Sequence, residues 1–245
     1  MNAELQCIPA EAAVPRYLAK TYWWAYVHPR AVHLFERQWL VNLILWGNFG
    51  RLCDEALGEL GTDLEGRTLQ IACVYGNLTR RIAARLAHGA QLHVVDVLRI
   101  QLDNLARKLP GSLLSRHGRY GPRQPPVALI QGDSSALQLA SRGYDRAFLF
   151  FLLHEQPEDV RRETLAEALR VVKPGGQIVI VDYHRPHPLH PLYWPMAALF
   201  TALEPFALDL WRGAVESWLP TGTHVAALRK RTFFGGLYQL VSITV

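Results

Sequence analysis

Residues 68–78, TLQIACVYGNL, decide the fold of this chain. Thr68 to Cys73 is a short apolar run that predicts a buried strand, and a helical pattern begins at Leu78 and continues to about His88. Between them, residues 72–77 (ACVYGN) form a short loop at the carboxyl end of the strand. A strand, a tight loop and a helix in this order are typical of the first unit of an α/β domain that holds a nucleotide-like ligand.

The same alternation continues along the chain. Further strands are predicted at residues 91–95, 127–131, 146–152 and 177–182, and further helices at residues 100–109 and 157–172. Such alternation implies a mostly parallel, doubly wound sheet whose ligands bind at the carboxyl ends of its strands. Residues 230–245 predict two strands around Gly235-Gly236, which would finish the sheet as an antiparallel hairpin.

Two aromatic helical segments flank this core. Residues 11–60 contain four of the seven tryptophans, and residues 184–222 begin with a His/Pro-rich turn and continue as an apolar helix. Packing against the core and a lid over a lipophilic ligand both account for such apolar stripes. We divide the chain into an N-terminal helical lid (1–60), a ligand-binding core (61–183), a helical lid insertion (184–222) and C-terminal strands that complete the sheet (223–245).

Charge and cysteine content argue against several classes of protein. The net charge of +5 is mild, and Lys and Arg are scattered rather than gathered in a stripe, so we predict no nucleic-acid binding. A weak attraction to anionic lipid headgroups fits the charge equally well. The three cysteines lack CxxC spacing, which argues against a zinc knuckle or a disulfide framework. Trp39 to Trp46 is too short to span a bilayer and no secretory signal is present, so we expect a cytoplasmic, non-integral protein.

Acidic residues follow two successive strands of the predicted core. Asp96 ends the second strand beside Val97, and Asp133 follows the third strand beside Ser134. Neither acid is specific alone, because isolated aspartates occur in most α/β proteins. Their order is more specific, since each falls at the carboxyl end of a strand, at the edge where a nucleotide-like ligand would bind.

These features together resemble the class I S-adenosylmethionine (SAM) methyltransferases, and especially the ubiquinone/menaquinone C-methyltransferases. The resemblance covers residues 67–183 and rests on LQIACVYGNLT (69–79), VVDV (94–97), QGD (131–133), FLLHE (151–155) and EALRVVKPGG (167–176). It implies a Rossmann-like fold with SAM as cofactor. The cofactor-binding residues that it implies are Ala72, Val74, Gly76, Asp96, Val97, Asp133 and Ser134. We expect Asp96 to bind the ribose hydroxyls and Asp133 to lie near the adenine amino group.

Over most of its length the chain is similar to the rhodoquinone-biosynthesis (RquA) family. The supporting segments are YWWAYVHPRAVHLFERQWLVNLILW (22–46), VYGN (74–77) and FFGGLY (233–238). The resemblance implies conversion of ubiquinone to rhodoquinone, in which a ring methoxy group becomes an amino group. It also implies SAM as the amino donor and a divalent metal, manganese.

A polyprenyl quinone is nearly insoluble in water, so the enzyme should meet it at the bilayer interface. We therefore expect peripheral association with the inner face of the membrane. Residues 23–46 and 193–211 should form a lid that flanks one hydrophobic pocket, open toward the membrane surface.

The loop after the first strand departs from the methyltransferase pattern. The usual Asp/Glu-x-Gly-x-Gly-x-Gly is replaced by Gln70, Ala72, Val74 and Gly76. We expect Val74 to disfavour the left-handed backbone open to glycine, and Gln70 to remove a charge that could hold the donor's ammonium group. Loss of a carboxylate favours the neutral, nucleophilic amine, as amination requires. The alternative is a drifted but ordinary methyltransferase loop.

Candidate catalytic and metal-binding residues lie at two further strand ends and in the loop. His154 and Glu155 follow the fourth strand, and Asp182 and His184 follow the fifth; manganese accepts this mixture of carboxylate and imidazole ligands. For His154 the alternative is a packed histidine that closes the strand. Tyr75 is predicted to stack on the donor or the substrate ring, and the alternative is a plain loop tyrosine. Tyr75 and His154 are the catalytic candidates.

The sequence leaves three functions open. They are SAM-dependent amination of a quinone, ordinary C- or O-methylation of a quinone or phenol, and non-catalytic binding of SAM or a quinone. We predict the first, because the loop departs from the methyltransferase pattern in the direction that amination needs.

Overall fold

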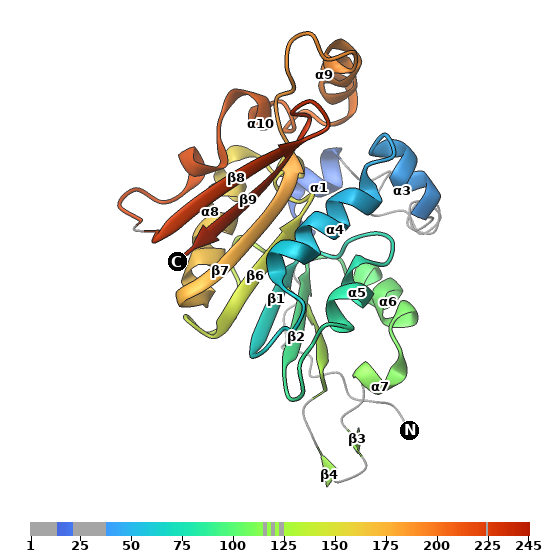
Figure 1. The fold of residues 1–245 in the computed structure, drawn as a ribbon, viewed down its shortest axis with the longest axis vertical. Helices are drawn as coiled ribbons and strands as arrows, with labels where there is room; N and C mark the ends of the chain where they lie inside the picture. Colours follow the sequence, from blue (N-terminus) through green and yellow to red (C-terminus); the bar gives the residue numbers. More distant parts are fainter. Residues whose placement is uncertain (1–13, 22–37, 115–116, 119–120, 123–124, 224) are drawn as a thin grey trace.

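One sheet of parallel strands with an antiparallel edge organises the protein (Figure 1). The computed structural model describes residues 14–21, 38–114, 117–118, 121–122, 125–223 and 225–245. The strands of the sheet, in spatial order, are β5 (Val127–Gln131), β2 (Gln91–Asp96), β1 (Arg67–Ile71), β6 (Tyr144–Phe150), β7 (Val172–Tyr183), β9 (Tyr238–Thr244) and β8 (Ala227–Phe233). Strands β5 to β7 are parallel, and β9 is antiparallel to both β7 and β8. The predicted parallel sheet with a C-terminal antiparallel hairpin is confirmed.

Helices connect the strands and cover the sheet. The described helices and turns are α1 (Arg16–Thr21), α3 (Gln38–Ile44), α4 (Phe49–Leu60), α5 (Leu78–Ala83), α6 (Arg99–Lys108), α7 (Gly111–Leu114), η2 (Leu153–Glu155), α8 (Glu158–Val171), α9 (Tyr193–Leu203), α10 (Asp209–Arg212) and η3 (Val215–Trp218). Helix α4 passes in front of the sheet and α8 behind it (Figure 1). A separate two-residue pair, β3 (His117–Gly118) and β4 (Gly121–Pro122), lies outside the main sheet.

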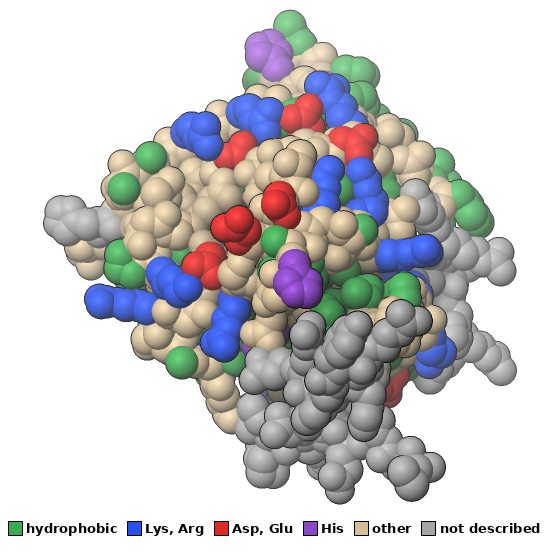
Figure 2. Space-filling model, turned by 60° about the horizontal axis from the view of Figure 1, so that its bottom comes forward, with side chains coloured by type: hydrophobic (Ala, Val, Ile, Leu, Met, Phe, Trp, Pro, Cys, Tyr) green, Lys and Arg blue, Asp and Glu red, His purple; other side chains and the backbone are tan. Residues whose placement is uncertain are grey.

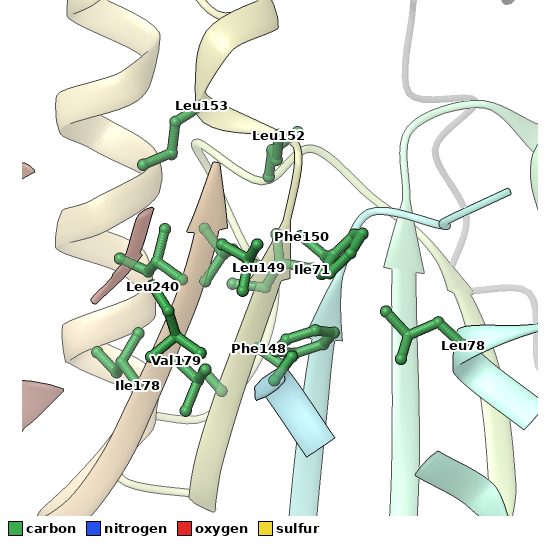
Figure 3. Packing of buried hydrophobic residues seen from close by; sticks show 14 of the residues in the cluster. Ile71, Leu78, Phe148, Leu149, Phe150, Leu152, Leu153, Ile178, Val179 and Leu240 are labelled. Carbon is green, nitrogen blue, oxygen red and sulfur yellow. The ribbon is translucent and has the colours of Figure 1, made fainter. Parts of the chain in front are cut away.

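The central strands are apolar on both faces because helices cover both faces of a parallel sheet. Residues after the first position of β1 are all buried, and so is the carboxyl half of β6. Figure 3 shows Phe148 of β6, Val179 of β7 and Leu240 of β9 in this core. Each of these side chains is at most 1 % exposed, so truncation of any one to alanine should cost about 2–5 kcal/mol.

Helix α5 ends earlier than its sequence pattern predicts. The pattern extends to about His88, whereas the helix ends at Ala83. Beyond that point, the backbone N–H of Ala87 donates to the carbonyl of Leu64 at 3.1 Å, and Leu86 forms a parallel bridge with Leu64. This pairing outside the helix competes with continued helical hydrogen bonds and ends the helix.

The N-terminal segment contributes helix α4 to the core. Its buried face packs against β7 and β9. Arg231 pairs with Glu55 at 2.8 Å, and Arg229 pairs with Glu59 at 2.7 Å, so the helix is also tied to the edge strand β8. The predicted N-terminal lid therefore includes a helix that covers the sheet. Residues 22–37, where two of its tryptophans lie, are outside the described residues.

The insertion after β7 is fastened to the core by one buried arginine. Arg161 of α8 is fully buried and donates to the carbonyls of Leu153, Gln156 and Phe206 at 2.8–3.1 Å. Its guanidinium also lies over the ring of Trp218 at 4.5 Å. The arginine thereby connects η2, which follows β6, to the insertion.

Charged side chains of both signs are mixed on the surface. On the face drawn in Figure 2, Lys and Arg side chains lie among Asp and Glu side chains and form no continuous basic stripe. The net charge of +5 is therefore not concentrated on this face. Within the part of the chain that the structure describes, no helix has the length and apolar character needed to cross a bilayer.

Candidate functional site

A cavity of about 200 Å³ lies at the carboxyl ends of β1, β2, β5 and β6, where the topology places ligands. We call it the main pocket. Nine of the residues singled out from the sequence line it: Ala72, Val74, Tyr75, Asp96, Val97, Asp133, Ser134, His154 and Glu155. The strand ends therefore bring together residues that are up to 83 positions apart in the chain (72 to 155).

Two backbone hydrogen bonds orient the carboxylate of Asp96 at the wall of the main pocket. The backbone N–H of Cys73 donates to its Oδ2 at 2.7 Å, and that of Leu98 donates to its Oδ1 at 2.8 Å. Burial raises the pKa of Asp96 to about 6, although these backbone donors oppose the shift. Each carboxylate oxygen can still accept a further hydrogen bond, as a ligand hydroxyl would require.

Asp133 and Ser134 form a tight turn after β5. Asp133 Oδ1 accepts hydrogen bonds from the backbone N–H and the hydroxyl of Ser135, at 2.9 and 2.8 Å. The hydroxyl of Ser134 accepts a hydrogen bond from Gln156 Nε2 and lies within hydrogen-bond distance of Thr164 Oγ1, both at 3.0 Å. Both residues are thus oriented by their neighbours and present a fixed wall to the cavity.

The strained position of the loop is Ala72, and Val74 avoids the left-handed backbone, as expected. Ala72 has a φ of 72°, in the left-handed region that favours glycine, whereas Val74 is not among the residues with positive φ. Gln70 is fully buried, and its Nε2 donates to the carbonyl of Ala72 at 3.0 Å. The glutamine side chain thus fixes the strained peptide, while the side chain of Val74 lines the main pocket.

A second strained residue lines the same cavity. Phe151, directly after β6, has a φ of 53°, and its backbone N–H donates to Val181 at 2.7 Å. Left-handed backbone in non-glycine residues costs roughly 1–3 kcal/mol and clusters at functional sites. Left-handed backbone occurs at Ala72 and Phe151, directly after the neighbouring strands β1 and β6. These two positions indicate that the ligand site lies at this edge of the sheet.

Gly76 shapes the turn into α5, whereas Tyr75 lines the main pocket. Gly76 has a φ of 82° but does not line the main pocket; a Cβ there would lie 3.0 Å from Phe49, so glycine is needed for the turn into α5. Tyr75 does line the pocket, and its hydroxyl accepts a hydrogen bond from Gln101 Nε2 at 2.8 Å. The contact with Gln101 holds the tyrosine at the wall of the cavity.

His154 and Asp182 form a buried pair behind the main pocket. His154 Nδ1 lies 2.9 Å from Asp182 Oδ1, and Asp182 also accepts the backbone N–H groups of Leu153, His154 and Tyr183. Burial alone would lower the pKa of His154, but the charge and hydrogen bond of Asp182 outweigh it and raise the pKa to about 9. The other ring nitrogen, Nε2, lies 3.8 Å from Glu155 Oε1. The pair is thus an imidazolium held by a carboxylate at the cavity wall.

The four residues predicted to hold manganese do not form a metal site. Asp182 is fully buried, and its two oxygens are occupied by four donors. His184 Nδ1 donates to the carbonyl of Gly236 at 2.7 Å, and the ring lines a different cavity from His154 and Glu155. Within the described ranges, no three His, Cys, Asp or Glu side chains are grouped so as to hold a metal ion. The donor set therefore does not fit manganese.

Sequence reasoning missed several walls of the main pocket. Tyr17 of α1 lines it, and burial, together with the carboxylates of Glu155 and Asp133, raises the pKa of its hydroxyl. Glu204, from the insertion, also lines it. These residues lack a local motif, because only long-range folding brings them to the strand ends.

The carboxylates that line the main pocket favour a positively charged ligand. Its lining contains four carboxylates, Asp96, Asp133, Glu155 and Glu204, and among the described residues no Lys or Arg. Phosphate-bearing dinucleotides require cations or an open helix N-terminus to offset their charge. Carboxylates in a largely apolar wall suit an organic cation, such as a sulfonium ion.

Only a few residues of the predicted aromatic lid line the main pocket in the described part of the chain. Within residues 193–211, Glu204 alone lines the cavity, while Tyr193, Phe200 and Trp211 pack on one another at ring distances of 5.2 and 5.5 Å. The two aromatic segments meet where Trp46 Nε1 donates to the sulfur of Met196 at 3.3 Å. From the N-terminal segment, Val41, Ile44 and Leu45 line the cavity.

Comparison with known proteins identifies the core. Residues 68–176 match the family described as "Methyltransferase domain". A demethylmenaquinone methyltransferase of Renibacterium salmoninarum is 34% identical over 79 residues, which cover 32% of this chain and 30% of the relative. A ubiquinone/menaquinone biosynthesis C-methyltransferase of Ectopseudomonas mendocina is 27% identical over 152 residues, covering 60% and 54%. The chain thus spans less than two thirds of the length of these two relatives.

Two further comparisons extend over more of the chain. An uncharacterized methyltransferase of Synechocystis is 26% identical over 227 residues, covering 89% of this chain and 92% of the relative. A crystal structure of a Pyrococcus horikoshii protein shares the fold, with a TM-score of 0.54 at 15% identity over 79% of this chain and 88% of that one. The central part of this chain therefore matches a methyltransferase domain, and the chain shows homology to the ubiquinone and menaquinone C-methyltransferases.

Proposed function

We propose that this protein binds SAM in the main pocket and uses it to aminate ubiquinone, which yields rhodoquinone. One observation carries the proposal: behind the wall of a pocket lined by carboxylates, the loop position that is usually acidic holds the buried Gln70, whose amide donates to the carbonyl of Ala72. The sulfonium of SAM is attracted by the carboxylates of the pocket. With Gln70 in place of the usual acid, the α-amine of SAM has no carboxylate partner at the loop. This favours the neutral form of the amine, which is the nucleophile.

The residues for cofactor binding follow from their places in the pocket. Asp96 accepts the ribose hydroxyls, and Asp133 with Ser134 faces the adenine amino group. Ala72, Val74 and Val97 contact the donor through the loop and the end of β2, and Tyr75 stacks on a ring of the donor or the substrate. Gly76 contributes indirectly, because it shapes the turn that carries the others.

The chemistry is an addition followed by an elimination at one ring carbon. The amine nitrogen adds to the carbon that carries a methoxy group, and a carbon–nitrogen bond forms. The carbon–oxygen bond to methoxide then breaks, and the departing methoxide takes up the proton lost from nitrogen, so methanol leaves. The oxidation level of the quinone is unchanged. Release of the amino group is then an elimination: a base takes a β-proton of the methionine skeleton, a Cα–Cβ double bond forms, and nitrogen keeps the electrons of the broken N–Cα bond and takes up a proton.

His154 and Glu155 supply the polar groups for this step. With a pKa of about 9, His154 is protonated at neutral pH, and its Nε2–H can donate to the quinone carbonyl that is conjugated with the attacked carbon. Glu155 is the nearby carboxylate that can take the proton from nitrogen. We therefore assign carbonyl polarisation to His154 and proton transfer to Glu155, without a metal.

The lipophilic substrate places the enzyme at the inner membrane surface. Exposed apolar side chains lie on α3, directly after it and on α9, in the two segments that meet at Met196; they are Trp39, Leu43, Trp46, Trp194 and Leu203. Such side chains insert into the interfacial region of a bilayer. The quinone would enter the pocket from that surface.

Mass spectrometry tests the reaction. The protein is incubated with a short-tailed ubiquinone analogue and SAM that carries a heavy-nitrogen label on the amine and deuterium on the methyl group. Amination gives a product that has lost methoxy and gained heavy nitrogen. A product that gains the deuterated methyl group would show ordinary methylation, and an unchanged quinone would show a binding protein; either result overturns the proposal.

A further inference from the structure

We propose that a second, basic groove of this protein binds the phosphate of an anionic lipid headgroup. The groove, of about 890 Å³, lies between the His/Pro-rich turn after β7, the α10 segment and the turn that joins β8 to β9. These three segments lie together at the top of Figure 1. We call it the headgroup groove; the residues that matter for binding are His184, Arg185, His187, Trp211, Arg212 and Lys230.

The charge of the headgroup groove is opposite to that of the main pocket. Arg185, Arg212 and Lys230 line it, and its described lining contains no Asp or Glu. Arg212 lies 3.7 Å from Asp209, but its side chain remains 75% exposed, so the guanidinium keeps most of its donors for a ligand. Three cations on one concave surface favour an anion, and phosphate oxygens are the acceptors that guanidinium groups fit best.

An uncharged N–H donor completes this surface. His187 Nδ1 accepts the backbone N–H of Leu189 at 3.2 Å, so a neutral His187 carries its proton on Nε2. Trp211 contributes an apolar part of the wall, because its indole nitrogen is buried.

The groove is preformed rather than assembled by its ligand. The backbone N–H of His184 donates to Leu237 at 2.8 Å, and that of His187 donates to Gly235 at 3.1 Å. The ring of His190 also packs on Phe234 at 5.2 Å. These contacts fasten the His/Pro-rich turn to the hairpin, so the binding groups keep their spacing without a ligand.

Apolar side chains beside the groove identify a lipid surface rather than a dissolved anion. Leu189, within the His/Pro-rich turn, is 86% exposed, and Trp194, at the start of α9, is 76% exposed. Arg185 reaches toward this helix, with Nη2 3.4 Å from the hydroxyl of Tyr193. A dissolved phosphate makes no favourable contact with exposed leucine and tryptophan side chains. In a bilayer, both side chains can insert beside the lipid headgroups.

The groove adjoins the main pocket through neighbouring residues of one strand end. Tyr183, the last residue of β7, lines the main pocket, and His184 lines the headgroup groove. A lipid bound in the groove would therefore hold the main pocket close to the bilayer. The benefit for a quinone substrate rests on the proposed function, but the lipid site itself does not.

Vesicle flotation at low salt tests the proposal. The full chain is mixed with vesicles of phosphatidylcholine alone or with added phosphatidylglycerol, and the variant is Arg212→Gln with Lys230→Gln. We expect binding only to the anionic vesicles and a loss of about 30-fold in the variant, since each cation near the surface contributes about 1 kcal/mol. The control is Arg80→Gln with Arg107→Gln, two exposed arginines on α5 and α6 that remove the same charge elsewhere. An equal loss in the control, or none in the groove variant, overturns the proposal.

Two further measurements separate the remaining explanations. Leu189→Ser with Trp194→Ser should weaken vesicle binding while the three cationic and two imidazole groups of the groove stay in place. Binding of inorganic phosphate by calorimetry, lost in the groove variant without any dependence on vesicles, would assign the groove to a dissolved anion and contradict the lipid site. SAM affinity should be unchanged in every variant, so failure of the lipid site and failure of the proposed function are distinguishable.

Discussion

At the scale of single residues, Asp96 couples cofactor binding to pH. Its pKa of about 6 results from burial, and the ribose hydroxyls need the ionised form as acceptor. Protonation therefore competes with SAM: affinity should be constant above pH 7 and about tenfold weaker at pH 5, one unit below the pKa. Calorimetry from pH 5 to 8 measures this, and Asp96→Asn should bind weakly at every pH. A flat profile in the wild type would contradict the role of Asp96.

The strain at Ala72 predicts an asymmetry between two substitutions. Ala72→Gly should raise the free energy of unfolding by about 0.5 kcal/mol, because relief of the left-handed backbone slightly exceeds the added entropy of the unfolded chain. Ala72→Val should lower it by about 2 kcal/mol, because a β-branched side chain tolerates that backbone least. Urea unfolding of both variants decides the matter; equal stabilities would mean that the position is unstrained.

Val74 acts through its side chain, since its backbone is ordinary. The valine side chain lines the main pocket beside the loop. Under the proposed function it would set the placement of the methionine end of SAM. Val74→Gly should leave SAM affinity within a few-fold and reduce amination by about 100-fold, the cost of a misplaced reacting group. The amination rate of Val74→Ala should lie between those of the wild type and Val74→Gly. If the wild type instead methylates and Val74→Gly methylates equally well, amination is wrong.

At the scale of elements, the turn after β6 depends on the pairing of His154 with Asp182. The folded pKa of His154, about 9, exceeds its ordinary value of 6.5. The pair therefore contributes its full stability below pH 6.5 and loses it as pH rises toward 9, an effect of about 3 kcal/mol. Urea unfolding at pH 6 and pH 9.5 measures the loss. His154→Gln should remove most of this pH dependence, and a persistent slope would assign it to other groups.

The strands were predictable from the sequence because their apolar runs are local signals. Residues 127–131 were assigned without error, and β2 differs by one residue at its end. Helix α5 was predicted too long, because the pairing of Leu86 with Leu64 depends on a distant segment. Asp96 and Asp133 were placed at the cavity by the parallel topology alone, since carboxyl ends of parallel strands share one edge.

The rest of the site depended on geometry that no local pattern encodes. Tyr17 and Glu204 reach the cavity from opposite ends of the chain. His184 lies two positions after Asp182, just beyond the end of β7, and its hydrogen bond to the carbonyl of Gly236 turns its ring into another cavity. The strain at Ala72 was not predicted, because φ is set by the turn, which the sequence pattern did not resolve.

At the scale of the whole molecule, charge is divided between two cavities at one end of the sheet. The main pocket gathers carboxylates, and the headgroup groove gathers cations. A net charge of +5 would by itself attract anions everywhere. The division lets a cationic cofactor and an anionic surface bind to the same protein without competition, because neither cavity suits the other's ligand.

This division predicts which nucleotide stabilises the fold. SAM at 100 times its dissociation constant should add about 2.7 kcal/mol to the free energy of unfolding, which for a chain of this size raises Tm by about 5–10 °C. NAD at the same concentration should leave Tm unchanged, because its diphosphate would face Asp96, Asp133 and Glu155, while the imidazolium of His154 in the same lining is already paired with Asp182. The test is a thermal melt followed by circular dichroism, with Asp96→Ala as the variant that should lose the response to SAM. A shift with NAD as large as that with SAM would contradict the electrostatic assignment, and with it the reading of the main pocket as a site for a sulfonium ion.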